Sequence, residues 1–384
     1  MQAKIDKIPI IRPWIGQEEV EAVADAIASG WVAQGPRVAE FERAVASRVL
    51  TQDAVAVSSC TAALHLALLV LGIGPGDEVI VPSLSFIATA NAARYVGAKP
   101  MFADVEPETL NLSARTIGEP ITEATRAVVL VHQGGVPADI DAIHELCDPL
   151  GIAVVEDAAC AMGSSYKGRP IGGHSDLVAF SFHPRKVITT GEGGMLTTSK
   201  LEWAERLRRL REHGMSVSAA ARHASSTPII ERYLETGFNY RMTDIQAAIG
   251  LVQLGRLDAV VARRRELAGR YQARLDEIPG LEIVHDPPYG RTNYQSFWVV
   301  LPQEFPVTRD RLLEMMMEKG ISCRRGIMAA HLEPAFEGQG RGELQVTERV
   351  SGGSLLLPLF YEMTEEDQGR VVAVIQDAAR QRPR

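Results

Sequence analysis

The chain has 384 residues, 46% of them hydrophobic, and a formal net charge of -8. This length excludes a small single-domain protein and predicts two or three domains around a sizeable core. The acidic balance and the lack of a dense lysine and arginine cluster argue against a nucleic-acid partner. The most basic run, residues 206–211, alternates with glutamate and leucine, so we interpret it as the solvated face of an amphipathic helix.

The cysteines and the apolar runs give no sign of a metal site or a membrane segment. The cysteine spacing matches no zinc pattern, so we expect no metal and four reduced thiols: Cys60, Cys147, Cys160 and Cys323. Residues 1–13 contain no apolar signal core. The longest apolar run, residues 62–71, is interrupted by His65 and is too short to span a bilayer. We therefore expect a soluble, cytoplasmic protein with no membrane partner.

Short β-rich runs alternate with helical stretches between residues 54 and 200. Strands are predicted over residues 54–57, 78–81, 100–104, 127–131, 152–155, 178–182 and 195–198. Helices are predicted between them, over residues 61–71, 88–95 and 141–150. Apolar strands separated by helices are typical of a sheet that is buried on both faces. We therefore predict an α/β fold with a mainly parallel sheet sandwiched by helices.

The composition changes towards the C-terminus. Residues 201–213 and 243–277 are strongly helical, and the second stretch is long enough to connect two domains. Beyond it, strands are predicted over residues 297–301 and 355–357, and helices over residues 309–319 and 365–380. This pattern predicts a smaller α+β domain. We place the large domain at residues 13–250 and the small domain at 251–384, with residues 1–12 a candidate to pack on the small one.

Ligands of open α/β sheets bind beyond the carboxyl ends of the strands, so the residues after each strand are the candidates for chemistry. Residues 58–61 lie between a strand and a helix whose N-terminus suits a phosphate group, although an ordinary helix cap is the alternative. Asp157 follows another strand. Its carboxylate either pairs with a cationic ring nitrogen or caps the next turn.

Lys186 follows the strand at 178–182, with the glycine-rich residues 191–194 nearby. A lysine with a lowered pKa forms Schiff bases with carbonyls, whereas most lysines are simply solvated. Residues 237–242 form a polar and aromatic turn before a helix, or an ordinary connection. Taken together, these segments fit pyridoxal 5′-phosphate (PLP), with Phe86 as a stacking face or else a core residue.

Several further motifs stand in a fixed order along the chain. They lie at residues 30–36 (GWVAQGP), 41–42, 76–83, 88–92, 104–105, 156–159, 181–183, 191–194, 239–242, 246–248, 331 and 355–358. In this order, and with Lys186, they resemble the DegT/DnrJ/EryC1/StrS family of sugar aminotransferases over nearly the whole chain. The resemblance implies the fold of the fold-type I PLP-dependent enzymes.

The resemblance implies a role for each matching residue. Lys186 is implied to hold PLP as a Schiff base, Asp157 to face the pyridine nitrogen, and Phe86 to stack on the ring. Contacts to the phosphate are implied for Thr61, Ala62 and Ser181. Asn239 is implied to reach the phosphate of a neighbouring subunit, which predicts a homodimer with shared active sites. Substrate contacts are implied, with weaker support, for Trp31, His183 and His331.

Two positions depart from the family pattern. The family often has glycine before the phosphate-binding threonine, where this chain has Cys60, which is tolerated if the loop turns without a positive φ. Near the ring hydroxyl of the cofactor the family often has glutamine or histidine, and this chain has Cys160. Because a thiol is a weaker hydrogen-bond partner, cofactor tuning or the substrate subclass is expected to differ.

The resemblance implies a ping-pong aminotransferase of amino-sugar biosynthesis. The amino donor is expected to be L-glutamate or L-glutamine, and the acceptor a nucleotide-linked keto-sugar. An aminocyclitol or another antibiotic-precursor ketone is an alternative acceptor. A PLP-dependent deoxysugar dehydratase is a second alternative, but such relatives carry histidine in place of Lys186. A non-catalytic PLP-binding regulatory protein is a third, and the presence of Lys186, Asp157 and Ser181 together argues against it.

Overall fold

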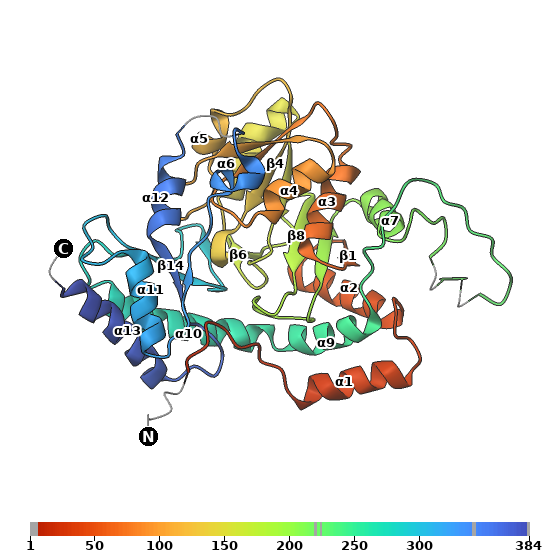
Figure 1. Ribbon diagram of the computed structural model, residues 1–384. Coiled ribbons are helices and arrows are strands. Elements are labelled where there is room, and N and C mark those ends of the chain that lie inside the picture. Colours follow the sequence, from red (N-terminus) through yellow and green to blue (C-terminus); the bar gives the residue numbers. More distant parts are fainter. Residues whose placement is uncertain (1–6, 219–220, 223–224, 340–342, 382–384) are drawn as a thin grey trace.

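The computed structural model describes residues 7–218, 221–222, 225–339 and 343–381. A seven-stranded sheet forms its centre (Figure 1). In spatial order its strands are β1 (Asp53–Val57), β9 (Gly194–Thr198), β8 (Leu177–Ser181), β5 (Ala153–Asp157), β4 (Thr125–Val131), β2 (Glu78–Pro82) and β3 (Lys99–Ala103). Six strands run parallel, and β9 is antiparallel to both of its neighbours. The predicted mainly parallel α/β sheet is confirmed.

Helices cover both faces of this sheet because its strands are apolar on both sides. Successive residues of a strand point to opposite faces, so Val55 and Val57 face one layer while Ala54 and Ala56 face the other. The first layer contains α3 (Cys60–Val70), α4 (Ala88–Tyr95) and α7 (Leu201–Leu210). The second contains α2 (Pro36–Val49), α5 (Ala114–Gly118), α6 (Ile140–Cys147) and α9 (Asp244–Gly255).

The long helix expected over residues 243–277 is broken. It forms α9 and α10 (Leu257–Leu275), which meet at a bend of 58°. Gly255, a weak helix former, ends α9. Next to it, Arg256 lies over the ring of Trp14 and pairs with Glu19 of α1 (Gln17–Ala28) at 2.9 Å. Among the described residues, no single helix has the length and apolar composition of a membrane span; this bent pair reaches them only when its halves are joined.

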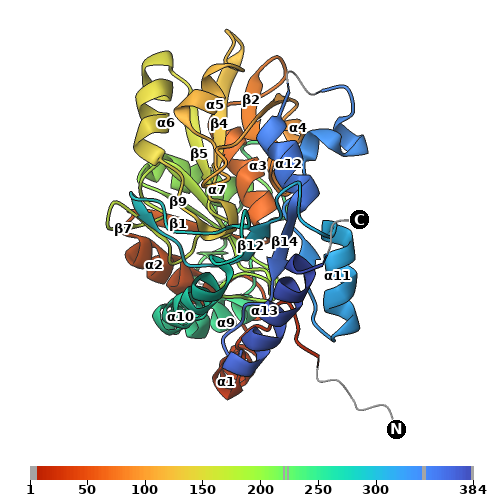
Figure 2. The same ribbon diagram turned by 90° about the vertical axis from the view of Figure 1, so that its left-hand side faces the viewer.

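A smaller antiparallel sheet lies towards the C-terminus. Its strands, in spatial order, are β10 (Glu282–Ile283), β12 (Phe297–Val300), β14 (Ser354–Leu357) and β13 (Arg324–Arg325). It packs with α10 and with α11 (Arg309–Glu318), α12 (Gln345–Gly353) and α13 (Glu365–Ala379). Figures 1 and 2 show α10, α11 and α13 gathered at one end of the molecule, away from α6.

The two parts of the chain are joined at several places. A three-stranded sheet combines β6 (Ser165–Tyr166) and β7 (Arg169–Pro170) with β11 (Gly290–Arg291). Near the N-terminus, the backbone of Ile8 bonds to Gly320 and Ser322 at 2.9 Å each. The division at residues 250 and 251 stays a prediction, and residues 1–6 lie outside the described part of the chain.

The basic run forms the solvated face that the sequence predicted only in part: Arg206, Arg208 and Arg209 keep 38%, 35% and 33% of their side chains exposed, but Arg211, just after α7, is buried. Arg208 binds Asp53 at 2.6 Å, and Arg211 is 5% exposed, where it binds Glu42 and the carbonyl of Ala56. Glu42 also accepts a hydrogen bond from the N–H of Ala56. The prediction was wrong for Arg211 because the end of α7 packs against β1 and α2, where this charge meets buried acceptors instead of water.

Candidate active site

A cavity of about 330 Å³ lies where the loops after β1, β2, β4, β5 and β8 converge. The carboxyl ends of parallel strands lie at one edge of a sheet, so residues far apart in sequence meet here. Because β9 is antiparallel, it brings its beginning, with Glu192 just before it, to the same edge. The cavity is lined by seven of the predicted residues: Thr61, Phe86, Asp157, Cys160, Ser181, His183 and Lys186.

The loop that carries Lys186 is fixed by hydrogen bonds. The Lys186 N–H donates to the carbonyl of His183 at 2.8 Å, and the Gln295 side chain donates to the carbonyl of Arg185 at 2.8 Å. The amine Nζ lies in the cavity wall, 3.1 Å from the Cys160 sulfur.

The surroundings of Lys186 raise its pKa above the ordinary value, although we reasoned from a lowered one. Burial acts to lower the pKa, but the Cys160 sulfur next to the amine and the negative charge of the nearby Asp157 outweigh it. Without a carbonyl partner, the amine is therefore an ammonium at neutral pH. A compound that reacts with it must first release that proton.

Asp157 ends β5 with its carboxylate held from two sides. The Thr89 hydroxyl donates to one oxygen at 2.9 Å, and the Ala159 N–H donates to the other at 3.1 Å. The Ser85 hydroxyl, 2.9 Å from that of Thr89, supports it from behind. The side chain is 5% exposed, so the carboxylate is fixed in one orientation at the cavity wall.

The two unusual cysteines both lie at this wall. Cys60 begins α3 without a positive φ, so the absence of glycine causes no backbone strain there. Its sulfur lies 3.9 Å from a carboxylate oxygen of Asp157. Burial and the negative charge of Asp157 raise the pKa of the Cys60 thiol, which keeps it protonated as a weak donor. Cys160 instead contacts Lys186.

A buried pair supports the strand that carries Asp157. Glu156 and His132, both fully buried, lie 2.9 Å apart at the ends of β5 and β4. Glu156 also accepts the Ser175 N–H at 2.7 Å. Burial acts to raise the pKa of Glu156, but His132 and Ser175 outweigh it and the pKa lies below its ordinary value. Because both groups are satisfied, this pair is expected to fix the strand ends rather than react.

The N-terminus of α3 also lines the cavity. Ser59 caps this helix by accepting the Ala62 N–H at 3.1 Å, so that N–H already has a partner and buried Ala62 does not line the cavity. Thr61 and Ser181 do line it. A Cβ on Gly194 would lie 2.4 Å from the carbonyl carbon of Ser59, so glycine is required for β9 to pass beside this turn.

The chain matches the model of the DegT/DnrJ/EryC1/StrS aminotransferase family over residues 13–376. It belongs to this family. The chain is therefore an aminotransferase, and its fold is that of the fold-type I aminotransferases.

Three relatives illustrate the match. The spore coat polysaccharide biosynthesis protein SpsC of Bacillus subtilis (strain 168) is 40% identical over 377 residues, 96% of each chain. The PLP form of Spr1654, a putative sugar aminotransferase from Streptococcus pneumoniae, is 26% identical with a TM-score of 0.90, covering 97% of this chain and 99% of that one. DesI, crystallised in the presence of its TDP-sugar product, is 31% identical with a TM-score of 0.87, covering 97% and 93%.

Besides Ala62, three predicted residues of this aminotransferase lie outside the lining of the cavity. Trp31 packs on Gly35, in a segment held by the Asp244 carboxylate through backbone N–H groups. Asn239 is exposed on a segment that bridges to Glu212. His331 is tied to Ser83 at 2.6 Å and lies 3.4 Å from Glu348. Their roles in binding stay predictions.

The cavity also contains residues to which sequence reasoning gave no role. They are Ser85, Thr89, Gln133, Arg185 and Glu192. Ser85 and Thr89 follow β2, a strand whose end lies at the cavity, and Arg185 is the chain neighbour of Lys186. Their positions in the sequence could therefore have made them candidates, but nothing in the sequence indicated that the Thr89 side chain contacts Asp157.

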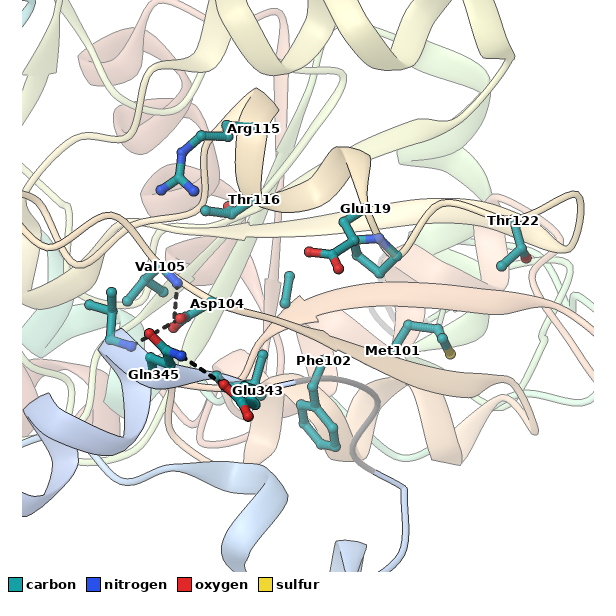
Figure 3. A pocket seen from close by; sticks show the side chains of 14 residues that line it. Met101, Phe102, Asp104, Val105, Arg115, Thr116, Glu119, Thr122, Glu343 and Gln345 are labelled. Carbon is teal, nitrogen blue, oxygen red and sulfur yellow. Dashed lines mark hydrogen bonds between the residues drawn. The ribbon is translucent and has the colours of Figure 1, made fainter.

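A second cavity, of about 430 Å³, lies between β3, α5 and the start of α12 and shares no lining residue with the first. Figure 3 shows Asp104 at its wall, next to Val105 and Gln345. Asp104 accepts the N–H groups of Val346 and Thr347 at 3.0 and 2.8 Å, which caps α12. This carboxylate is therefore engaged in joining two elements.

Proposed function

We propose that this aminotransferase moves an amino group from L-glutamate or L-glutamine to a nucleotide-linked keto-sugar, with PLP bound through Lys186. One observation carries the proposal: the Lys186 amine and the Asp157 carboxylate face a single cavity that opens at the N-terminus of a helix. The TDP-sugar product of DesI and the polysaccharide pathway of SpsC support a sugar acceptor.

The residues present fit PLP. The cofactor needs an amine for its aldehyde, an acid facing its ring nitrogen and a cradle for its phosphate. Lys186 and Asp157 supply the first two, and Thr61, Ser181 and the first turn of α3 supply the third. Phe86 lines the cavity and is 65% exposed, which is unusual for a large apolar ring and suits one that stacks on a ligand. Cys160 would lie near the ring hydroxyl.

When bound, PLP supplies an electron sink for the bond that breaks at the donor's α-carbon. Asp157 would hold the proton on the ring nitrogen, because its carboxylate is fixed by Thr89 and Ala159 and its charge favours the cation. Lys186 Nζ, released from the cofactor by the donor, would take the proton from the donor's α-carbon and deliver it to the cofactor's C4′. The same residues would serve the reverse half-reaction with the keto-sugar.

We also propose that two copies of the chain share their active sites. The segment after α7 extends away from the body of the molecule (Figure 1) and exposes Tyr233, Leu234 and Ile230, the last at 91%. Apolar side chains in such a position are typical of a surface covered by a partner. Asn239, at the base of this segment and outside its own cavity, would then reach the phosphate in the partner's cavity.

Absorbance measurements test the proposed function. We expect the purified holoenzyme to be yellow, to lose its visible absorbance with L-glutamate or L-glutamine, and to regain it with a nucleotide keto-sugar. Borohydride reduction followed by peptide mapping is expected to label Lys186. A label on another residue, or an absorbance that no amino donor changes, would contradict the proposal. Including aminocyclitol precursor ketones in the screen tests the alternative acceptor.

Mixed dimers test the shared site. Lys186→Ala and Asn239→Ala subunits are each expected to be poorly active alone. If Asn239 acts in the partner's cavity, a mixed dimer contains one cavity with both native residues and recovers activity. If Asn239 acts in its own cavity, no native site forms and mixing gives no recovery, which would contradict the proposal. Sedimentation velocity checks that the species are dimers.

A further inference from the structure

A short connection in the C-terminal part of the chain reaches two backbone carbonyls at the active-site cavity. It runs over residues 292–296, between β11 and β12. The Gln295 side chain donates to the carbonyl of Arg185 at 2.8 Å, and the Asn293 side chain donates to the carbonyl of Cys160 at 2.8 Å. Asn293 is fully buried and Gln295 is 8% exposed. Neither side chain lines the cavity, so both act on it through the backbone.

Both amides are held in one orientation by their other hydrogen bonds. Gln295 Oε1 accepts the Ser296 hydroxyl at 2.9 Å. Asn293 Oδ1 accepts the Gln295 N–H at 2.8 Å, and Asn293 Nδ2 also donates to the carbonyl of Met162 at 2.8 Å. A Cβ on Gly135 would overlap Asn293 Oδ1, so glycine is required beside this amide. With their oxygens engaged, the two side chains direct their N–H groups at the two carbonyls.

A buried arginine fixes the connection itself. Arg264 of α10 is 3% exposed, and its guanidinium donates to the carbonyls of Tyr294, Gln295 and Leu359 at 2.7, 2.5 and 3.1 Å. Within the described residues it has no carboxylate partner. A buried charge is costly unless its donors are satisfied, so these carbonyls are held firmly in place.

The bond from Gln295 acts on the peptide unit just before the Lys186 side chain. The carbonyl of this unit belongs to Arg185 and is held by Gln295, while its N–H belongs to Lys186 and donates to the carbonyl of His183 at 2.8 Å. Because a peptide unit is planar, holding both of its polar groups fixes the plane from which the lysine side chain starts. One of the two holds is local, and the other comes from the C-terminal part.

Asn293 acts in the same way on the residue that contacts the amine. By holding the carbonyl of Cys160, it fixes the residue whose sulfur lies 3.1 Å from Lys186 Nζ. We propose that Asn293 and Gln295 are positioning residues of the amino transfer, which set the place of the Lys186 amine in the cavity wall. The inference rests on the proposed function. A lysine side chain is a flexible four-carbon stem, so its amine meets the donor's α-carbon reproducibly only if the backbone beneath it is fixed.

The test compares Gln295→Met with Gln368→Met, which each remove a buried amide that donates to a backbone carbonyl at 2.8 Å. Gln368 of α13 is a matched control because it is 1% exposed, donates to Leu267 and lies outside the cavity lining. In single-turnover loss of absorbance with L-glutamate, we expect Gln295→Met to lower the maximal rate by about tenfold or more, because small displacements of a reacting group are costly. The half-saturating concentration should stay unchanged, and the control should match the unsubstituted enzyme.

A spectroscopic signature separates a displaced amine from a general loss of packing. PLP is achiral, so the visible circular dichroism of lysine-bound PLP reports how the protein holds the ring. We expect this signal, per bound cofactor, to change in Gln295→Met and in Asn293→Ser but not in Gln368→Met. Should Gln295→Met not fold, Gln295→Asn tests the same contact, because it keeps the amide but is too short to reach the carbonyl.

The outcomes distinguish this proposal from the proposed function. The positioning role is overturned if Gln295→Met keeps both the rate and the visible circular dichroism of the unsubstituted enzyme, or if Gln368→Met loses as much. If the unsubstituted enzyme reacts with no amino donor, the proposed function fails instead. The circular dichroism still tests the two amides in that case, because it requires bound PLP but no donor.

Discussion

The cavity beside α12 and the candidate active site are similar in size but differ in how their polar groups are used. In the cavity beside α12, Asp104 accepts three hydrogen bonds from the helix it caps, and Arg115 pairs with Glu106 at 2.6 Å. In the smaller of the two, Lys186 and Arg185 line the wall, and within the described residues neither side chain forms a hydrogen bond or an ion pair with a carboxylate. Volume does not mark the site. The active site is distinguished by polar groups that remain available to a ligand.

The largest effect on activity is expected from removing the Lys186 amine, which is the main available group of the active-site cavity. Lys186→Ala should lower turnover by about a thousandfold or more, because it removes both the covalent anchor and the group that moves the proton. It should also abolish the visible absorbance due to lysine-bound PLP. Steady-state rates and an absorbance spectrum measure these effects. Near-normal turnover would contradict the assignment of Lys186 as the group that holds PLP and moves the proton.

The next effect concerns the carboxylate of the same cavity. Asp157→Ala should slow the transfer by about a hundredfold or more, since the positive charge on the ring nitrogen loses its stabilising partner. PLP should also bind more weakly. Equilibrium dialysis and single-turnover rates measure both. A variant with normal rates would mean that Asp157 is a structural cap, as the alternative interpretation of the sequence held.

A smaller effect is expected one contact further from the cavity. Thr89→Val removes the 2.9 Å hydrogen bond to Asp157 at nearly constant volume. Because hydrogen bonds to charged groups are worth about 1.5–3 kcal/mol, we expect roughly a tenfold loss in the rate of the first half-reaction. Ser85→Ala, which leaves Thr89 in place, serves as the control and should cost less. Equal losses in both variants would assign the effect to general packing.

In the other cavity we expect changes in stability without changes in chemistry. Asp104→Ala removes the cap of α12 and should lower the free energy of unfolding by about 1–3 kcal/mol, with the half-reaction rates unchanged. Denaturant unfolding and single-turnover assays measure the two quantities. A large loss of activity in a folded Asp104→Ala protein would break the comparison, because it would give this cavity a part in the reaction.

The smallest effect is expected at the rim of that cavity. The side chain of Arg115 is 71% exposed, and surface ion pairs contribute little because water and salt screen them. Arg115→Ala should leave both the melting temperature and the rates unchanged within error. A clear loss of activity would indicate a ligand at this cavity and would contradict the view that its charges serve the fold.

Much of the fold was predictable because the strands are short apolar runs bounded by turns. The helix at residues 88–95 was predicted at its observed bounds, and the strands of the central sheet within one or two residues. The prediction of one continuous helix over residues 243–277 was wrong because the bend at Arg256 depends on Trp14 and Glu19, which are distant in sequence. The prediction that Arg211 is solvated was wrong for the same reason, since its buried partner Glu42 lies on α2, far away in sequence.

The sequence by itself determined which chemical groups follow each strand, and hence that a lysine, an aspartate and a helix N-terminus were candidates for one site. Only the tertiary structure decided which of them meet. It placed Thr89 against Asp157 and Cys160 against Lys186, and it left Asn239 outside its own cavity. The physical reason is that a strand pattern fixes local conformation, whereas contacts between loops depend on strand order and packing, which no local pattern encodes.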